Sequence, residues 1–291
     1  MEPKASGRVI GYPQVALAVA AACALFFAWL AIAPGSDPLN LVVNNTVQSL
    51  AAWIGAGACA AVALRASRRR RSTWLLLAES AAAFALGQAA WSYYELVAGS
   101  TTPFPSLADI GFLAARGLAV AALMFAAVPM GPMSRIRCGL DALMVATSLL
   151  LVTWATAVSS PSGEVGSMLS QVVALGYSFG DIAVLSLALT LLSQAPAAKR
   201  GPLLLLVAHS GVLVMTNTIY AHRLFSQQYA TGSLLDVGWM TANLLLALAA
   251  LHPGEDLSAD ADERSMSSWD LRCPTCPCWL ASPWRGSSSS P

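Results

Sequence analysis

Four residues that can carry or attract charge lie in and between two long apolar runs of this 291-residue chain. Trp91 and Glu95 are four residues apart at the end of one run, and Asp109 and Arg116 are seven apart in the next. Each pair therefore shares one face of a helix. A charged side chain in the apolar core of a bilayer costs at least ~2.5 kcal/mol. We therefore expect these charges to face one another or a wet cavity.

Two more acids occupy similar positions later in the chain. L-A-D-I-G-F-L contains Asp109, F-G-D-I-A-V-L contains Asp181 and L-D-V-G-W-M contains Asp236. Each acid is followed by an apolar helical run. This pattern suggests a repeated unit of two helices that carries its acid toward the outer half of a membrane.

These residues predict a polar pocket that opens to the outer face. Arg116 is two turns inside its span, so we expect a carboxylate to hold it, and Asp109 and Glu95 are the nearest in depth. The alternative is that the aromatic side chains form interfacial belts and that the acids cap helices. The predicted ligand-binding residues are Trp91, Tyr94, Glu95, Asp109, Arg116, Asp181, Asp236 and Trp239.

The sequence predicts no catalytic residue, metal or cofactor. It contains no H-E-x-x-H, G-x-S-x-G or Walker motif, and His209, His222 and His252 lack a metal-binding spacing. The six cysteines do not form a secreted disulfide pattern, so we expect them to be reduced. Three of them crowd the tail, but a structural zinc site needs four ligands.

The elements that must position the pocket are membrane helices. The chain is 56% hydrophobic and 11% charged with a mean hydropathy of +0.62, whereas soluble domains are about 25% charged. A net charge of +1 without a pooled basic surface gives no reason to expect a nucleic-acid partner. We therefore predict an all-α, polytopic integral membrane bundle whose main partner is the lipid bilayer.

About eight apolar runs are long enough to span a bilayer. In the first, Ala31-Ile32-Ala33 resembles a signal-peptide cleavage site. The run is longer than the usual ~7–15 residues, however, and Pro34 would follow the cut, so a span is favoured. The predicted spans are residues 15–33, 47–64, 74–97, 107–128, a segment from near 138 to before 161, 169–192, 203–224 and 234–251.

Local signals mark how the spans meet. Pro103 and Pro105 break the helical path between the third and fourth spans, and Ser106 is placed to cap the fourth. Gly176 and Gly180 form a G-x-x-x-G in the sixth span, which lets a neighbouring backbone approach closely.

The basic residues orient the bundle. With eight spans, all of the 16 Lys and Arg residues except Arg116 and Arg223 fall on one side. The positive-inside rule therefore places both the N-terminus and the C-terminus in the cytoplasm. We interpret the arginine block at residues 68–71 as a topology anchor.

One family shares several of these runs. P-F-P-S-L-A-D-I-G-F-L preceded by W-S-Y-Y-E, then L-D-A-L-M-V, Y-S-F-G-D-I-A-V-L and L-D-V-G-W-M, resembles the multi-span N-terminal sensor region of bacterial diguanylate cyclase and phosphodiesterase proteins, especially actinobacterial ones. The resemblance covers residues 74–253. In that family, cytoplasmic GGDEF and often EAL domains follow the helices and make or degrade cyclic di-GMP.

No GGDEF or EAL signature follows Pro253, so the resemblance implies a non-enzymatic input module of cyclic di-GMP signalling in the bacterial inner membrane. By analogy with paired outputs, it also implies a homodimer. The chain then divides into a membrane module, residues 1–253, and a polar, disordered cytoplasmic tail, residues 254–291. From Trp269 the tail shows neither helix nor strand periodicity, which suggests out-of-frame translation that cuts off a catalytic domain.

Two classes of function fit this pattern. The first is a sensor that binds an unknown small molecule or lipid in the outer pocket. The second is a small-solute transporter or channel-like protein that uses the same acids along a pathway. The usual sign of a transporter is a pair of broken helices at matching positions in the two halves of the chain, and this sequence shows no such pair.

Overall fold

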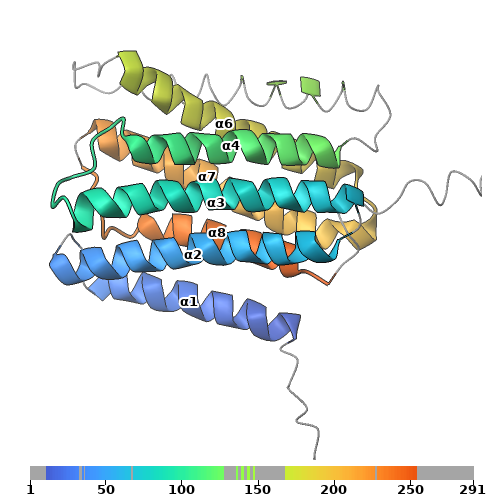
Figure 1. The fold of residues 1–291 in the computed structure, drawn as a ribbon, viewed down its shortest axis with the longest axis horizontal. Helices are drawn as coiled ribbons and strands as arrows, with labels where there is room; N and C mark the ends of the chain where they lie inside the picture. Colours follow the sequence, from blue (N-terminus) through green and yellow to red (C-terminus); the bar gives the residue numbers. More distant parts are fainter. Residues whose placement is uncertain are drawn as a thin grey trace, which may run out of the picture. The chain divides into compact units, whose positions relative to one another are not determined.

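The computed structural model describes residues 11–32, 35, 37–66, 68–127, 136, 139–140, 143–144, 147, 168–226 and 228–253. Every regular element in these ranges is a helix, which confirms the prediction of an all-α fold (Figure 1). Most of the predicted fifth span and the whole tail lie outside the described residues. The elements are α1 (Tyr12–Ile32), α2 (Pro38–Arg65), α3 (Arg68–Leu96), α4 (Leu107–Ala126), α6 (Met168–Gln194), the short 3₁₀ helix η1 (Ala197–Lys199), α7 (Arg200–Phe225) and α8 (Asp236–Leu251).

Six of these helices enclose a common interior. Going around it, α2 packs on α3, α3 on α4, α4 on α6, α6 on α7, α7 on α8, and α8 again on α2. The helices therefore form a closed ring. α1 packs against α8 and takes no part in the ring (Figure 1).

α2 begins at Pro38, well before the predicted start at Val47. The Asp37 carboxylate accepts the Asn40 N–H at 3.4 Å, and Pro38 takes the first helical position, where its missing N–H costs nothing. The additional turns carry buried asparagines such as Asn40 and Asn44. Their polarity lowers the local hydropathy, and this is why the prediction placed the start too late.

The α3–α4 connection has the predicted cap. The Ser106 hydroxyl accepts the Ala108 N–H at 3.2 Å, and the Asp109 carboxylate accepts the Ser106 N–H at 2.6 Å. This reciprocal arrangement is a capping box. One turn later the two helices touch at Gly111, where an added Cβ would lie 2.7 Å from the Ala83 carbonyl oxygen. α3 and α4 therefore pack backbone to backbone beside the cap.

Within the described part of the chain, five helices are long and apolar enough to cross a membrane, namely α1, α2, α4, α6 and α7 as far as Leu224. α8 is apolar but has only 16 residues, and α3 is long but more polar. Apolar side chains such as Leu17 and Leu25 are 71% and 72% exposed, as expected for groups that face lipid. The membrane class is therefore supported, while the count of eight spans stays a prediction.

The interior of the ring has an apolar half and a polar half. Small and aliphatic side chains fill the half near the α2–α3 junction, where Cys59, Trp74, Leu123, Leu187 and Ala250 belong to one buried cluster. Most of the buried charged and amide side chains lie toward the other end, where α3 turns into α4 and α7 into α8.

Candidate functional site

A cavity of about 170 Å³ lies inside the ring, and we call it the central cavity. All six ring helices contribute to its wall, together with the α3–α4 and α7–α8 connections. A single water requires only roughly 10–15 Å³ by this kind of measure, so the space admits a small molecule. The polar and aromatic residues of the wall include Asn44, Gln48, Gln88, Trp91, Asp109, Arg116, Tyr177, Asp181, Asn217, Tyr220, Tyr229, Thr231, Asp236 and Trp239.

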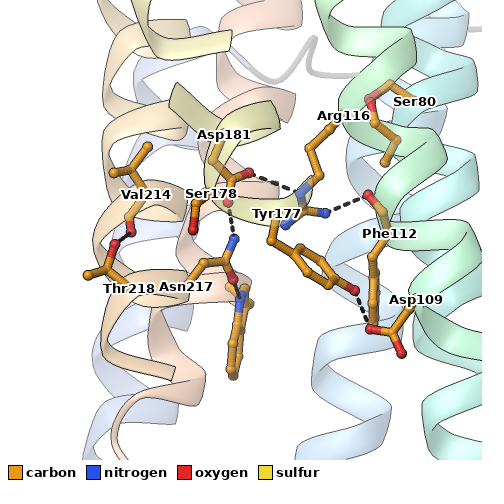
Figure 2. Close-up of polar contacts among 12 residues, drawn as sticks. Ser80, Asp109, Phe112, Arg116, Tyr177, Ser178, Asp181, Val214, Asn217 and Thr218 are labelled. Carbon is orange, nitrogen blue, oxygen red and sulfur yellow. Dashed lines mark hydrogen bonds and ion pairs between the residues drawn. The ribbon is translucent and has the colours of Figure 1, made fainter. Parts of the chain in front are cut away.

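A buried ion pair joins α4 to α6 in this wall (Figure 2). Arg116 Nε donates to Asp181 Oδ1 at 3.0 Å, and the two side chains are only 7% and 3% exposed. Arg116 Nη1 also donates to the Phe112 carbonyl oxygen at 2.7 Å. The other carboxylate oxygen of Asp181 accepts Asn217 Nδ2 at 2.6 Å, and Trp239 Nε1 donates to Asn217 Oδ1 at 2.8 Å. The network therefore runs from α4 to α8.

The predicted G-x-x-x-G explains how α4 and α6 come this close. A Cβ at Gly180 would lie 2.8 Å from the Arg116 Cβ, and one at Gly176 would lie 3.2 Å from the Leu113 side chain. Small residues at such a crossing allow close packing of membrane helices. The same crossing sets Arg116 beside Asp181.

Asp109 is bonded to neutral donors. Its Oδ1 accepts the Tyr177 hydroxyl at 2.6 Å, and its Oδ2 accepts the Ser106 N–H and hydroxyl. The Arg116 guanidinium lies over the Tyr177 ring, 4.7 Å from its centroid (Figure 2). The expectation that Asp109 or Glu95 would hold Arg116 is therefore wrong. Depth in the membrane suggested those acids, but the packing of α6 on α4 brings Asp181 to Arg116.

Asp236 is 1% exposed, and its carboxylate receives hydrogen bonds from three residues on two segments, α2 and the α7–α8 connection. Asn44 Nδ2 donates to Oδ2 at 2.5 Å, the Gly232 N–H donates to Oδ2 at 2.7 Å, and the Tyr229 hydroxyl donates to Oδ1 at 3.1 Å. Gln48 Nε2 donates to the Asp236 carbonyl oxygen at 2.5 Å. Burial raises the pKa of Tyr229, in the α7–α8 connection, well above its ordinary value, so this hydroxyl remains a donor.

Glu95 anchors the end of α3. Asn45 Nδ2 donates to Glu95 Oε2 at 2.7 Å, and the Thr231 hydroxyl donates to the other carboxylate oxygen. The Ser92 hydroxyl donates to Asn45 Oδ1 at 2.8 Å. Glu95 itself does not border the central cavity, but Thr231 does.

Four aromatic rings pack edge to face along the wall of the cavity, and we call them the aromatic quartet: Trp91, Tyr220, Tyr229 and Trp239. The ring centroids of Tyr220 and Tyr229 are 4.8 Å apart, and those of Tyr220 and Trp239 are 5.4 Å apart. Trp91 lies 6.4 Å from both tyrosines. These are ordinary spacings for favourable aromatic pairs.

The structure gathers most of the residues that the sequence singled out. Glu95 is one hydrogen bond away from the cavity wall, and Tyr94 packs instead on Tyr93, which is 57% exposed. The predicted ligand-binding residues that border the central cavity are Trp91, Asp109, Arg116, Asp181, Asp236 and Trp239.

Several residues of the wall and of its supporting network were missed by sequence reasoning. Asn40, Asn44 and Gln48 recur every four residues, and this signal of one polar face on α2 was available. Tyr177 and Asn217 gave no such signal, because single polar residues in apolar helices are common. Only the packing of α6 and α7 shows that each of them binds a buried aspartate.

The wall can fix an occupant through hydrogen bonds, charge and aromatic faces. The described residues of the wall include three aspartates and one arginine. Within the part of the chain that the structure describes, no group of three His, Cys, Asp or Glu residues could hold a metal ion. Comparisons with protein-family models, with curated proteins and with solved structures find no match to this chain.

Proposed function

We propose that this chain is a sensory input module of a bacterial inner membrane, which binds a small molecule or lipid in the central cavity. The single observation that carries the proposal is the composition of the cavity wall. Six helices and two connections contribute to it, so one occupant contacts every element of the ring. An occupant that contacts several helices would bind two arrangements of the ring with different affinities, as a switch requires.

The side of the membrane follows from the positive-inside rule. The polar end of the ring contains the α3–α4 and α7–α8 connections, whereas the arginine block at residues 68–71 lies at the opposite end of α3. The proposed pocket therefore faces outward. α8 leads from Asp236 in the cavity wall to Leu251, at the end that the proposed orientation assigns to the cytoplasm. Displacement of α8 is thus the route by which we propose that binding is transmitted.

The output of such a module would be a partner protein or a catalytic domain. The resemblance to sensor regions of cyclic di-GMP proteins supports this role. Pairing of two copies follows from the same analogy.

A transporter is the second candidate. A smaller cavity of about 40 Å³ shares Arg116 and Asp181 with the central cavity and continues past them to His209 and Asn243. The ion pair therefore separates two hollow spaces along the ring axis, as a gate would. A channel or carrier would open this pair during its cycle.

The test measures binding and flux on the same preparation. Protein in detergent is screened for ligands by thermal shift, and each hit is then offered to liposomes that contain the protein. Binding without flux supports the sensor, and flux supports the transporter. A matched pair of variants on α7 localises the effect: Ala221→Phe fills the cavity, whereas Ala208→Phe adds a ring on the exposed face. If both variants retain every thermal shift, the central cavity is not the binding site.

A further inference from the structure

The charge of the central cavity is unbalanced. Among the residues that the structure describes, its wall contains Asp109, Asp181 and Asp236 but a single basic residue, Arg116. Arg116 is occupied by its ion pair with Asp181. Among the described residues, Asp109 and Asp236 accept hydrogen bonds from hydroxyl, amide and backbone N–H groups and have no cationic partner. Two carboxylates therefore face a space of low dielectric without a counter-charge, and a bound cation would be stabilised there.

The aromatic quartet favours the same sign of charge. The faces of Trp and Tyr rings carry negative electrostatic potential and attract ammonium and guanidinium groups. Trp91, Tyr220, Tyr229 and Trp239 all border the cavity. Tyr229 also donates to Asp236 at 3.1 Å, so the rings and this carboxylate lie side by side. An anion would meet repulsion from both groups.

Gln48 adds a requirement for a hydrogen-bond donor. Its amide nitrogen must be the atom that meets the Asp236 carbonyl oxygen, because that oxygen can only accept. Its Oε1 is buried and has no donor among the described residues, although Gln48 borders the cavity. A buried acceptor without a donor is costly. An N–H group from an occupant would satisfy it.

We propose that the central cavity selects a small organic ammonium ion that carries at least one N–H and an apolar body. Asp236 and Asp109 supply the counter-charge, the aromatic quartet contacts the cationic head, and Gln48 accepts its N–H. Apolar wall residues such as Val214 and Leu224 contact the remainder. This assignment rests on the proposed function of the cavity as a binding site.

Five probes test the class of ligand. Four have a similar shape, namely 2-phenylethylammonium, its N,N,N-trimethyl analogue, 3-phenylpropionate and 2-phenylethanol. The fifth is butylammonium, a slimmer primary amine. Binding to the purified protein is measured by isothermal titration calorimetry. We expect a primary ammonium ion to bind at least about tenfold more tightly than the carboxylate or the alcohol, since charge-assisted hydrogen bonds and cation–π contacts are lost in both.

Variants then locate the contacts. Asp236→Asn and Trp91→Leu are each expected to weaken binding of the primary ammonium about tenfold or more. Trp91→Leu leaves the hydrogen-bond network of Asp236 intact, so it remains informative if Asp236→Asn does not fold. Gln48→Leu should weaken the primary ammonium several-fold more than the trimethyl analogue, which has no N–H to donate. Glu79→Gln and Tyr93→Leu change an exposed acid and an exposed ring and should leave binding unchanged.

The results separate the ligand class from the site. If the carboxylate or the alcohol binds as tightly as the ammonium ions and Ala221→Phe abolishes that binding, the cationic class is overturned while the cavity stands as a site. If none of the ammonium probes binds, the proposed class is likewise overturned. If ammonium binding survives Asp236→Asn, Trp91→Leu and Ala221→Phe alike, both the class and the cavity are overturned.

Discussion

Replacement of Asp181 by asparagine probes the ion pair at the centre of the ring. The substitution keeps the shape of the side chain but exchanges one carboxylate oxygen for an NH₂ group. In the native protein, both oxygens accept, one from Arg116 and one from Asn217. In either orientation of the new amide, its NH₂ group would face one of these two donors. Asp181→Asn therefore loses one hydrogen bond as well as the charge.

The expected cost follows from burial. Removing one partner of a buried pair costs ~3–5 kcal/mol, because the other charge is left without its counter-ion. Arg116 would keep its bond to the Phe112 carbonyl oxygen and its contact with the Tyr177 ring, and a cation–π contact contributes ~0.5–2 kcal/mol. We therefore expect the lower end of the range, about 3 kcal/mol of unfolding free energy.

Reversible unfolding in mixed detergent micelles, followed by circular dichroism, measures this loss. Arg116→Gln and the double variant complete a cycle with Asp181→Asn, and neighbours in one network usually couple by ~0.5–3 kcal/mol. Glu79→Gln, at an exposed position of α3, serves as the control. A loss below ~0.5 kcal/mol for Asp181→Asn, with additive effects in the double variant, would refute the inference that this pair holds α4 to α6.

Two further substitutions test how the wall is built. Gly111→Ala should lower stability by ~1–3 kcal/mol in the same unfolding assay, since its Cβ would lie 2.7 Å from the Ala83 carbonyl oxygen. Gly117→Ala on the same helix meets no atom of the described residues within 4 Å and should be neutral or stabilising by up to ~1 kcal/mol. Equal effects of the two changes would contradict the close packing of α3 on α4. Ser106→Ala should cost ~1 kcal/mol because it removes the cap of α4, and Ser106→Thr should restore most of that loss; no difference between them would argue against the capping box.

Local chemistry was readable from the chain. Ser106 was expected to cap α4 because a hydroxyl just before an apolar run satisfies free backbone N–H groups, and the structure contains that bond. The mean hydropathy and the lengths of the apolar runs indicated membrane helices, since every backbone polar group in lipid must be satisfied within a helix. A charged side chain in lipid costs free energy, and for this reason the sequence singled out Asp109, Arg116, Asp181 and Asp236. All four border the central cavity.

The partners of these charges depended on packing. Sequence gives the depth of a residue along its helix but not which neighbour it meets around the axis. Arg116 therefore pairs with Asp181 on α6 rather than with an acid closer in the chain, because small residues at Gly176 and Gly180 let α6 approach α4. The aromatic quartet is likewise assembled from α3, α7, the α7–α8 connection and α8.

The sequence by itself determined the helices, their affinity for lipid and the residues too polar to face it, because these properties depend on neighbours along the chain. The tertiary structure decided which polar groups satisfy one another and which face the central cavity. That choice depends on how six helices close into a ring, and contacts between residues far apart in the chain fix this closure.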